Sequence, residues 1–152
     1  MASKNTVTLT GGGGLDTRDF SRFAKALRRQ APDMAVTLRK ELRAAGEIVA
    51  ADARARASFS SKIPASIKTR VSGATISIVA GSKKAADAAP YENEGKQGDF
   101  RHPLFGNRAV WISQKAHPFL HPALEAGRPA VMDAALQALD RAVDQVTRDT
   151  DA

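Results

Sequence analysis

The chain has no cysteine, one tryptophan and one tyrosine among its 152 residues. The missing cysteines exclude disulfide bonds, thiolate metal ligands and cysteine nucleophiles, and their absence suits a reducing cytoplasm. No stretch approaches the roughly 18 apolar residues that a membrane-spanning helix requires. Residues 1–6 also lack the apolar core of a signal peptide. These absences predict a soluble protein that is made in the cytoplasm and does not enter a membrane.

Sequence signatures of catalysis are missing as well. No serine lies in a Gly-x-Ser-x-Gly nucleophile elbow. The glycines at 11–14 lack the Lys-Ser or Lys-Thr pair that completes a phosphate-binding loop. Glu92 and Glu94, two residues apart in a turn, are more typical of solvated side chains than of a glycosidase carboxylate pair. The sequence therefore predicts no enzymatic activity and no catalytic residue.

Each of the three histidines stands directly before a proline. His117 and His121 are four residues apart, the spacing at which a helix brings two zinc ligands together. Proline restricts the residue before it to extended geometry, so we expect both histidines to lie outside a helix. They, and His102, should pack or hydrogen-bond around proline turns. We expect neither a metal site nor a cofactor.

Positive charge is in excess, with a net value of +7, and it is unevenly placed. Residues 18–56 hold ten basic and five acidic side chains, residues 57–124 nine and four, and residues 125–152 three and six. A basic surface attracts phosphate groups, and complementary patches on one chain favour the docking of one copy on the next. Charge thus leaves two functions open, nucleic-acid binding and self-assembly.

The length fits one domain, which can bury about two-thirds of its unfolded surface. We expect residues 1–15 to form a flexible arm, because four consecutive glycines and a polar composition do not offset the entropy lost on ordering. Residues 16–147 then form a single α+β domain, and residues 148–152 form a flexible tail.

Apolar spacing predicts three helices. Asp16 or Thr17 can cap the first, which carries Phe20, Phe23 and Leu27 on one face and ends near Ala31. The second starts at Pro32 and runs to about Ala57. Its apolar residues recur every three or four positions: Met34, Leu38, Leu42, Ala45 and Val49. The third spans residues 129–147. Its apolar seam should bury against a sheet, another helix or another subunit; it comprises Met132, Leu136, Leu139, Val143 and Val146.

Alternating apolar and polar residues predict strands at 67–71 and 75–80, joined by a turn at 72–74. We expect a short helix or turn at 81–89, a loop at 95–98 and a further strand at 107–112. The fold class is therefore α+β, with long N-terminal amphipathic helices and a C-terminal helix packed on a small, mainly antiparallel sheet.

Residues 90–125 concentrate the chain's unusual residues: all three histidines, the only Trp and Tyr, and four of the seven prolines. Prolines at this spacing impose a fixed path of short extended pieces and turns. The aromatic residues of this segment could stack on nucleic-acid bases. Aromatic side chains beside arginines are also typical of domain cores and subunit interfaces, and we favour that interpretation.

Two motifs in this segment resemble a known family. A Tyr-Glu-x-x-Gly turn occupies residues 91–95, and Pro-Phe-x-x-Pro-Ala-Leu-Glu occupies residues 118–125, before the last helix. In this order the elements resemble the small tail-completion and head-to-tail connector proteins of long-tailed bacteriophages, which include neck and tail-terminator-like members. This chain departs from the common pattern by an insertion at 99–111.

The resemblance implies an α+β subunit without enzymatic activity that forms a ring, with six copies as the best estimate. The ring would complete or terminate the tail at the virion neck and join it to the head connector, after assembly in the host cytoplasm. Its partners would be itself, a head connector or stopper protein, a tail-tube or terminator protein, and viral DNA passing through without sequence-specific binding. The alternative is a small basic nucleic-acid-binding protein. The residues expected at interfaces are Tyr91, Glu92, Arg101, Phe105, Arg108, Trp111, Phe119, Leu120 and Glu125.

Overall fold

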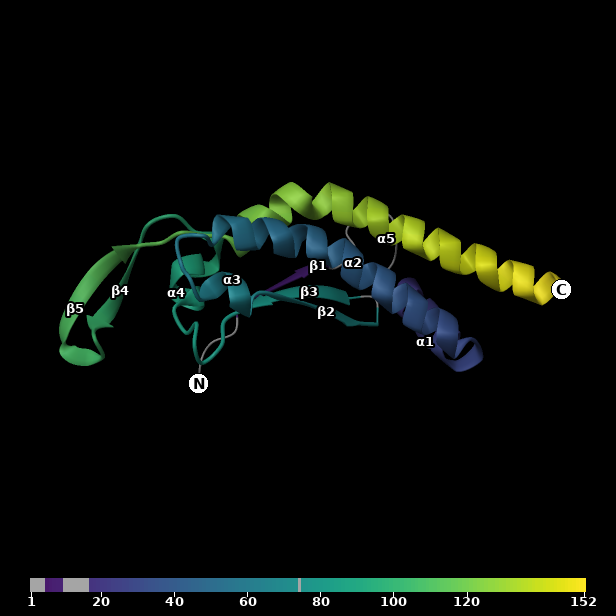
Figure 1. Cartoon of the computed structure of the whole chain (residues 1–152), viewed down its shortest axis with the longest axis horizontal. Coiled ribbons are helices and arrows are strands. Elements are labelled where there is room, and N and C mark those ends of the chain that lie inside the picture. The colour runs from purple at the N-terminus through teal and green to yellow at the C-terminus, as the bar shows by residue number, and fades with distance from the viewer. Residues whose placement is uncertain (1–4, 10–16, 74) are drawn as a thin grey trace.

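A computed structural model describes residues 5–9, 17–73 and 75–152. It has the expected α+β fold, with helices in two layers over a small sheet and a separate hairpin at one end (Figure 1). The helices are α1 (Thr17–Gln30), α2 (Pro32–Arg56), α3 (Ile63–Ser66), α4 (Ala88–Glu92) and α5 (Leu120–Asp151), with a 3-10 turn η1 at Asn93–Gly95. The strands are β1 (Asn5–Leu9), β2 (Lys68–Ser72), β3 (Thr75–Ala80), β4 (Asp99–Leu104) and β5 (Asn107–Lys115).

Helix α2 is the central element of the core, with the sheet on one side and α5 on the other. Two glycines allow this close packing. A Cβ on Gly46 would lie 2.6 Å from side-chain atoms of Ile76 and Thr69 in the sheet. A Cβ on Gly127 of α5 would lie 2.8 Å from Val49 Cγ2. Because neither contact leaves room for a side chain, these positions determine how closely the three layers approach.

The sheet that faces α2 has three antiparallel strands in the order β1-β3-β2. The predicted hairpin of β2 and β3 is confirmed. Strand β1 is a correction, since Asn5–Leu9 lie in the segment that we expected to be a flexible arm. This piece alternates threonine with apolar residues, and it pairs with the edge of β3 that β2 leaves free. The rest of the expected arm, including the glycine tract, lies outside the described residues.

Sequence periodicity predicted the ends of α1 and α2 to within about two residues of those in the structure. Leu27 of α1 is buried, and on α2 the expected positions Leu38, Leu42 and Val49 are all buried. Pro32 stands at the first helical position, where a missing N–H costs nothing.

The C-terminal helix differs from the prediction in its length. It begins at Leu120, well before Pro129, and continues through the residues expected to form a flexible tail. Pro129 lacks the N–H that would bond to the carbonyl of Glu125, but both residues are exposed, so water can satisfy that carbonyl. The face of α5 that packs on α2 also differs from the prediction, because its residues are smaller than those of the predicted seam. The buried residues in this half of the helix are Val131, Ala138 and Ala142.

The second sheet is a two-stranded hairpin, β4 and β5, which projects from one end of the elongated molecule, away from the C-terminal end of α5 (Figure 1). We predicted β5 in part and missed β4, whose fifth residue is a proline. Pro103 precedes a break in the register, at a position where a ladder N–H is dispensable.

Candidate assembly site

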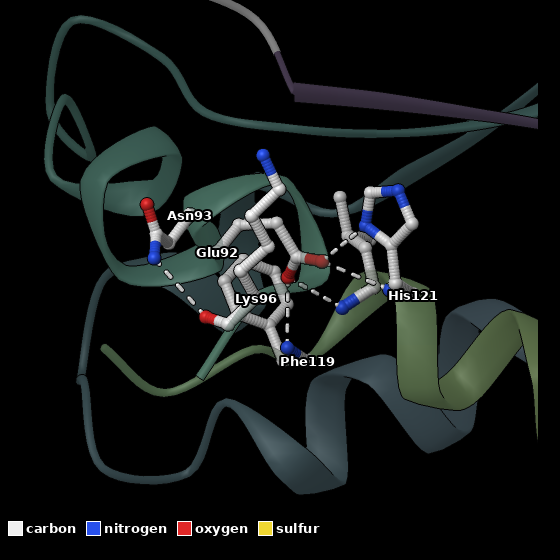
Figure 2. A network of polar contacts seen from close by, with 6 residues as sticks. Glu92, Asn93, Lys96, Phe119 and His121 are labelled. Atoms are coloured by element: carbon white, nitrogen blue, oxygen red, sulfur yellow. Dashed lines mark hydrogen bonds and ion pairs between the residues drawn. The ribbon is translucent and has the colours of Figure 1, made fainter. Parts of the chain in front are cut away.

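Glu92 links the two motifs of residues 90–125. Its carboxylate is fully buried and accepts backbone N–H groups from Phe119 at 2.7 Å, Leu120 at 2.7 Å and His121 at 2.9 Å (Figure 2). His121 Nδ1 lies 2.6 Å from Glu92 Oε1, where the ring N–H donates to the carboxylate. The side chain therefore caps the start of α5 from α4, a different part of the chain.

This cap accounts for every backbone N–H group at the start of α5 that has no partner within the helix. The first four N–H groups of a helix have no partner within it, and here they belong to residues 119–122. Three donate to Glu92, and the fourth residue, Pro122, has no N–H. A carboxylate is also the group that the positive end of the helix macrodipole favours. The burial of Glu92 is thus explained by its hydrogen bonds.

Two expectations are corrected here. Glu92 is not solvated as the turn suggested, whereas Glu94 is exposed and pairs with Lys96 at 3.0 Å. His121 lies on a helix, because the cap allows α5 to start before Pro122; in the first turn a proline is tolerated.

Gly95 completes the capping turn. Its φ of +78° belongs to the left-handed region, and a Cβ there would stand 2.7 Å from Cβ and Cγ of His121. The glycine of the Tyr-Glu-x-x-Gly motif is therefore required twice, once for the turn and once for the histidine that packs on it.

Tyr91 connects this junction with the base of the hairpin. Its carbonyl accepts the N–H of His117 at 2.9 Å, and its ring lies 5.0 Å from that of Phe59 and 5.4 Å from that of Phe100 in β4. The Tyr91 hydroxyl accepts a hydrogen bond from Gln114 of β5. Sequence reasoning missed both Phe59 and Gln114, since each acts through partners far along the chain.

Residues of one hairpin face hold its base against the body. His102 Nε2 lies 2.8 Å from Gln114 Oε1, and the rings of Phe100 and His102 are 5.7 Å apart. Along a strand, side chains alternate between faces, so Arg101 and Trp111 belong to the opposite face. That face is exposed, and Trp111 retains 49% of its accessible surface. The hairpin is thus positioned by one face and free on the other.

The tip of the hairpin carries Phe105, which is 98% exposed. Phe105 and Gly106 form the turn, with φ values of +47° and +79°. Two-residue hairpin turns favour asparagine or glycine at such positions, and a bulky residue there is unusual. In the described residues no ring packs against Phe105. The fold therefore gains nothing from this side chain, although the turn holds it outward.

The outer face of α5 has the opposite charge. Leu136 and Val143 are exposed and seven residues apart, which places them on one side of the helix. Residues three or four positions away lie beside them on the helix, and these include Asp133 and Asp140 but no arginine. The exposed acidic residues of this face are Glu125, Asp133, Asp140, Asp144 and Asp151. We call this surface the acidic face of α5.

The nine residues expected at interfaces therefore fall into two groups. Glu92, Phe119 and Leu120 are fully buried and Tyr91 is half-buried, so these four serve the internal junction. The other five are exposed: Arg101, Phe105, Arg108 and Trp111 on the hairpin, and Glu125 on the acidic face of α5.

The described residues contain no cluster of three histidine, cysteine, aspartate or glutamate side chains that could hold a metal ion. Among the helices of the described part, none is long and apolar enough to cross a bilayer. No protein-family model, curated protein or solved structure matches the chain.

Proposed function

We propose that this protein is a structural subunit of a closed ring at the neck of a long-tailed phage, where it completes or terminates the tail and joins it to the head connector. One observation carries the proposal. A basic hairpin with exposed aromatic residues lies at one end of the molecule, and an acidic face with exposed apolar residues runs along α5 toward the other end (Figure 1). The motif resemblance supplies the biological setting.

The two surfaces suit each other in chemistry. Arg101 and Arg108 lie on the same hairpin as Phe105 and Trp111, and both arginines are exposed. The acidic face of α5 offers carboxylates around two apolar side chains. Burial of aromatic and aliphatic surface stabilises such a contact, and the charges steer the approach and fix the register.

Their placement favours a head-to-tail contact between copies. The hairpin and the C-terminal half of α5 lie at opposite ends of one chain, so a contact between them requires a second molecule (Figure 1). Contacts between two different patches repeat from copy to copy, and they close into a ring when the rotation between copies allows it. The remaining partners, a head connector or stopper protein and a tail-tube or terminator protein, would bind the two sides of that ring, with viral DNA in its lumen.

Charge reversal tests the proposal. Arg101→Glu with Arg108→Glu should prevent assembly, and Asp140→Lys with Asp144→Lys should do the same. Combined in one chain, the four changes restore opposite charges and should restore the ring. Native mass spectrometry and negative-stain images of the purified chain give the number of copies and the shape.

Lys83→Glu with Lys84→Glu is the matched control, because it reverses two exposed charges in the loop after β3 and should leave assembly intact. A chain that stays monomeric at high concentration, both alone and with tail-tube protein, would overturn the proposal. Failure of the combined variant to recover would refute the pairing of these two surfaces.

A further inference from the structure

A basic cleft lies on the other side of the molecule's small sheet from the residues that pack on α2. It has a volume of about 670 Å³ and is formed by the α3 region, β2 and the loop that follows β3. Five of its lining residues are cationic and none is acidic. These cations are Lys62, Lys68, Arg70, Lys83 and Lys84.

The five cations have no internal partner to account for them. All are exposed, and within the described part of the chain none of their side chains forms an ion pair or a hydrogen bond. Some basic residues elsewhere in the chain are paired, as Arg54 is with Glu47 and Arg141 is with Glu41. Like charges this close repel one another, so the cleft is a favourable place for an anion with several negative charges.

Two hydrogen bonds of one serine connect segments that line the cleft. Ser66, at the end of α3, donates to the carbonyl of Ile63 at 2.7 Å and accepts the N–H of Gly81 at 3.0 Å. This bridge ties α3 to the loop that carries Lys83 and Lys84. Thr69 of β2 points to Gly46 of α2, so Lys68 and Arg70 point to the opposite side of the sheet.

The spacing favours an extended anion over a single ion. Lys68 and Arg70 are two residues apart on a strand, which separates them by about 6.6 Å along its axis. Cations from the α3 region and from the loop after β3 border the same cleft, so its positive charges come from three separate segments of the chain. A polymer with regularly spaced phosphates can contact several of these side chains at once, whereas one small anion contacts few of them.

We propose that this cleft binds the phosphate backbone of duplex DNA without reading its sequence. Each neutralised phosphate releases condensed counterions, so binding weakens steeply as salt rises. The proposal stands apart from ring assembly, because it concerns a surface that a single copy already possesses.

Fluorescence anisotropy with a labelled 30-base-pair duplex of arbitrary sequence tests the cleft. Five phosphate contacts predict a loss of affinity of about 500-fold between 50 and 200 mM salt. The triple variant Lys68→Ala, Lys83→Ala, Lys84→Ala leaves two contacts and should reduce that loss to about 12-fold. A second duplex of unrelated sequence should bind equally well.

The matched control is the triple variant Lys25→Ala, Arg28→Ala, Arg29→Ala, which removes the same charge from exposed positions of α1, outside both the cleft and the proposed ring contact, and should keep the salt dependence of the unaltered chain. Equal loss in both triple variants would overturn the cleft as the site. Tighter binding to phosphatidylserine vesicles than to DNA, or complete displacement of DNA by millimolar inorganic phosphate, would also overturn it. Assembly of the cleft variant remains a separate readout, so either proposal can fail alone.

Discussion

The capping junction and the hairpin tip use similar residues in opposite ways. At the junction, Phe119 is fully buried and the Glu92 carboxylate accepts four hydrogen bonds. At the tip, Phe105 is almost fully exposed in a turn conformation that suits asparagine better. An isolated two-stranded hairpin has little stability of its own. The junction therefore maintains the fold, whereas the exposed side chain at the tip contributes nothing to it.

The largest effect should come from the two phenylalanines. Phe119→Ala should lower the free energy of unfolding by about 3–5 kcal/mol, because it empties a fully buried site. Phe105→Asn should leave that free energy unchanged or raise it slightly, since asparagine tolerates a positive φ, and should prevent ring formation. Urea denaturation measures the first quantity and native mass spectrometry the second. If Phe105→Asn still formed rings, the tip would not be a docking surface.

Sequence patterns predicted the elements that depend on local periodicity. Helix α2 and the β2-β3 hairpin each bury one face with a regular repeat, and the repeat was enough to place them. Strand β1 was missed because its partner β3 is far along the chain. Strand β4 was missed because Pro103 masks it; a proline is compatible only with an irregular or edge position.

The start of α5 was unpredictable for a different physical reason. Pro122 suggests an extended path, and the group that permits a helix there is Glu92, 27 residues before Phe119. A cap supplied over that distance leaves no local pattern. The apolar seam of α5 was predicted only in part: Leu136 and Val143 are exposed, and the buried residues of this half of the helix are Val131, Ala138 and Ala142. Composition identified the exposed arginines and aromatic residues of the hairpin as candidate site residues. It could not distinguish them from Glu92, Phe119 and Leu120, which are buried at the junction.

A second comparison concerns two glutamates within one turn. Glu92→Gln should lower the free energy of unfolding by about 2–3 kcal/mol, because the amide loses charge-assisted hydrogen bonds and turns an N–H group toward backbone donors. Glu94→Gln should change it by less than about 0.5 kcal/mol, since this side chain is 80% exposed in its pair with Lys96. Urea denaturation followed by circular dichroism measures both variants. Equal effects would mean that the cap at α5 does not support the fold.

Alanine substitutions at two glycines provide a further comparison of the junction with the hairpin tip. Gly95 and Gly106 have nearly the same positive φ, +78° and +79°. Gly106→Ala should cost about 1 kcal/mol from backbone strain alone, because nothing lies within 4 Å of an added Cβ. Gly95→Ala should cost about 2 kcal/mol, since strain is joined by the clash with His121. The difference between the two thermal or urea midpoints isolates the packing of the junction, and no difference would contradict it.

The smallest expected effect concerns pH and the packing of α2 on β2. Arg54 donates hydrogen bonds to Glu47 Oε2 at 2.9 Å and to the carbonyl of Ile67 at 3.0 Å. The hydrogen bond from Arg54 is the main cause that holds the pKa of Glu47 below its ordinary value of 4.5. A carboxyl with a lowered pKa in the folded chain stabilises the fold above its unfolded pKa, and this contribution disappears as pH falls through the folded pKa.

Acid should therefore weaken the unaltered chain slightly more than it weakens Glu47→Gln, in the range below pH 4.5. The two side chains are 36% and 44% exposed, so solvent screens the pair and the difference should stay below about 1 kcal/mol. Urea midpoints at neutral pH and in this acid range measure it. Arg54→Gln should remove the largest part of this pH dependence, because it withdraws the main donor to Glu47, and should in addition loosen the carbonyl contact at Ile67. If Glu47→Gln retained the full acid sensitivity while Arg54→Gln lost it, the carboxylate would not be the titrating partner, and Arg54 would act through the strand alone.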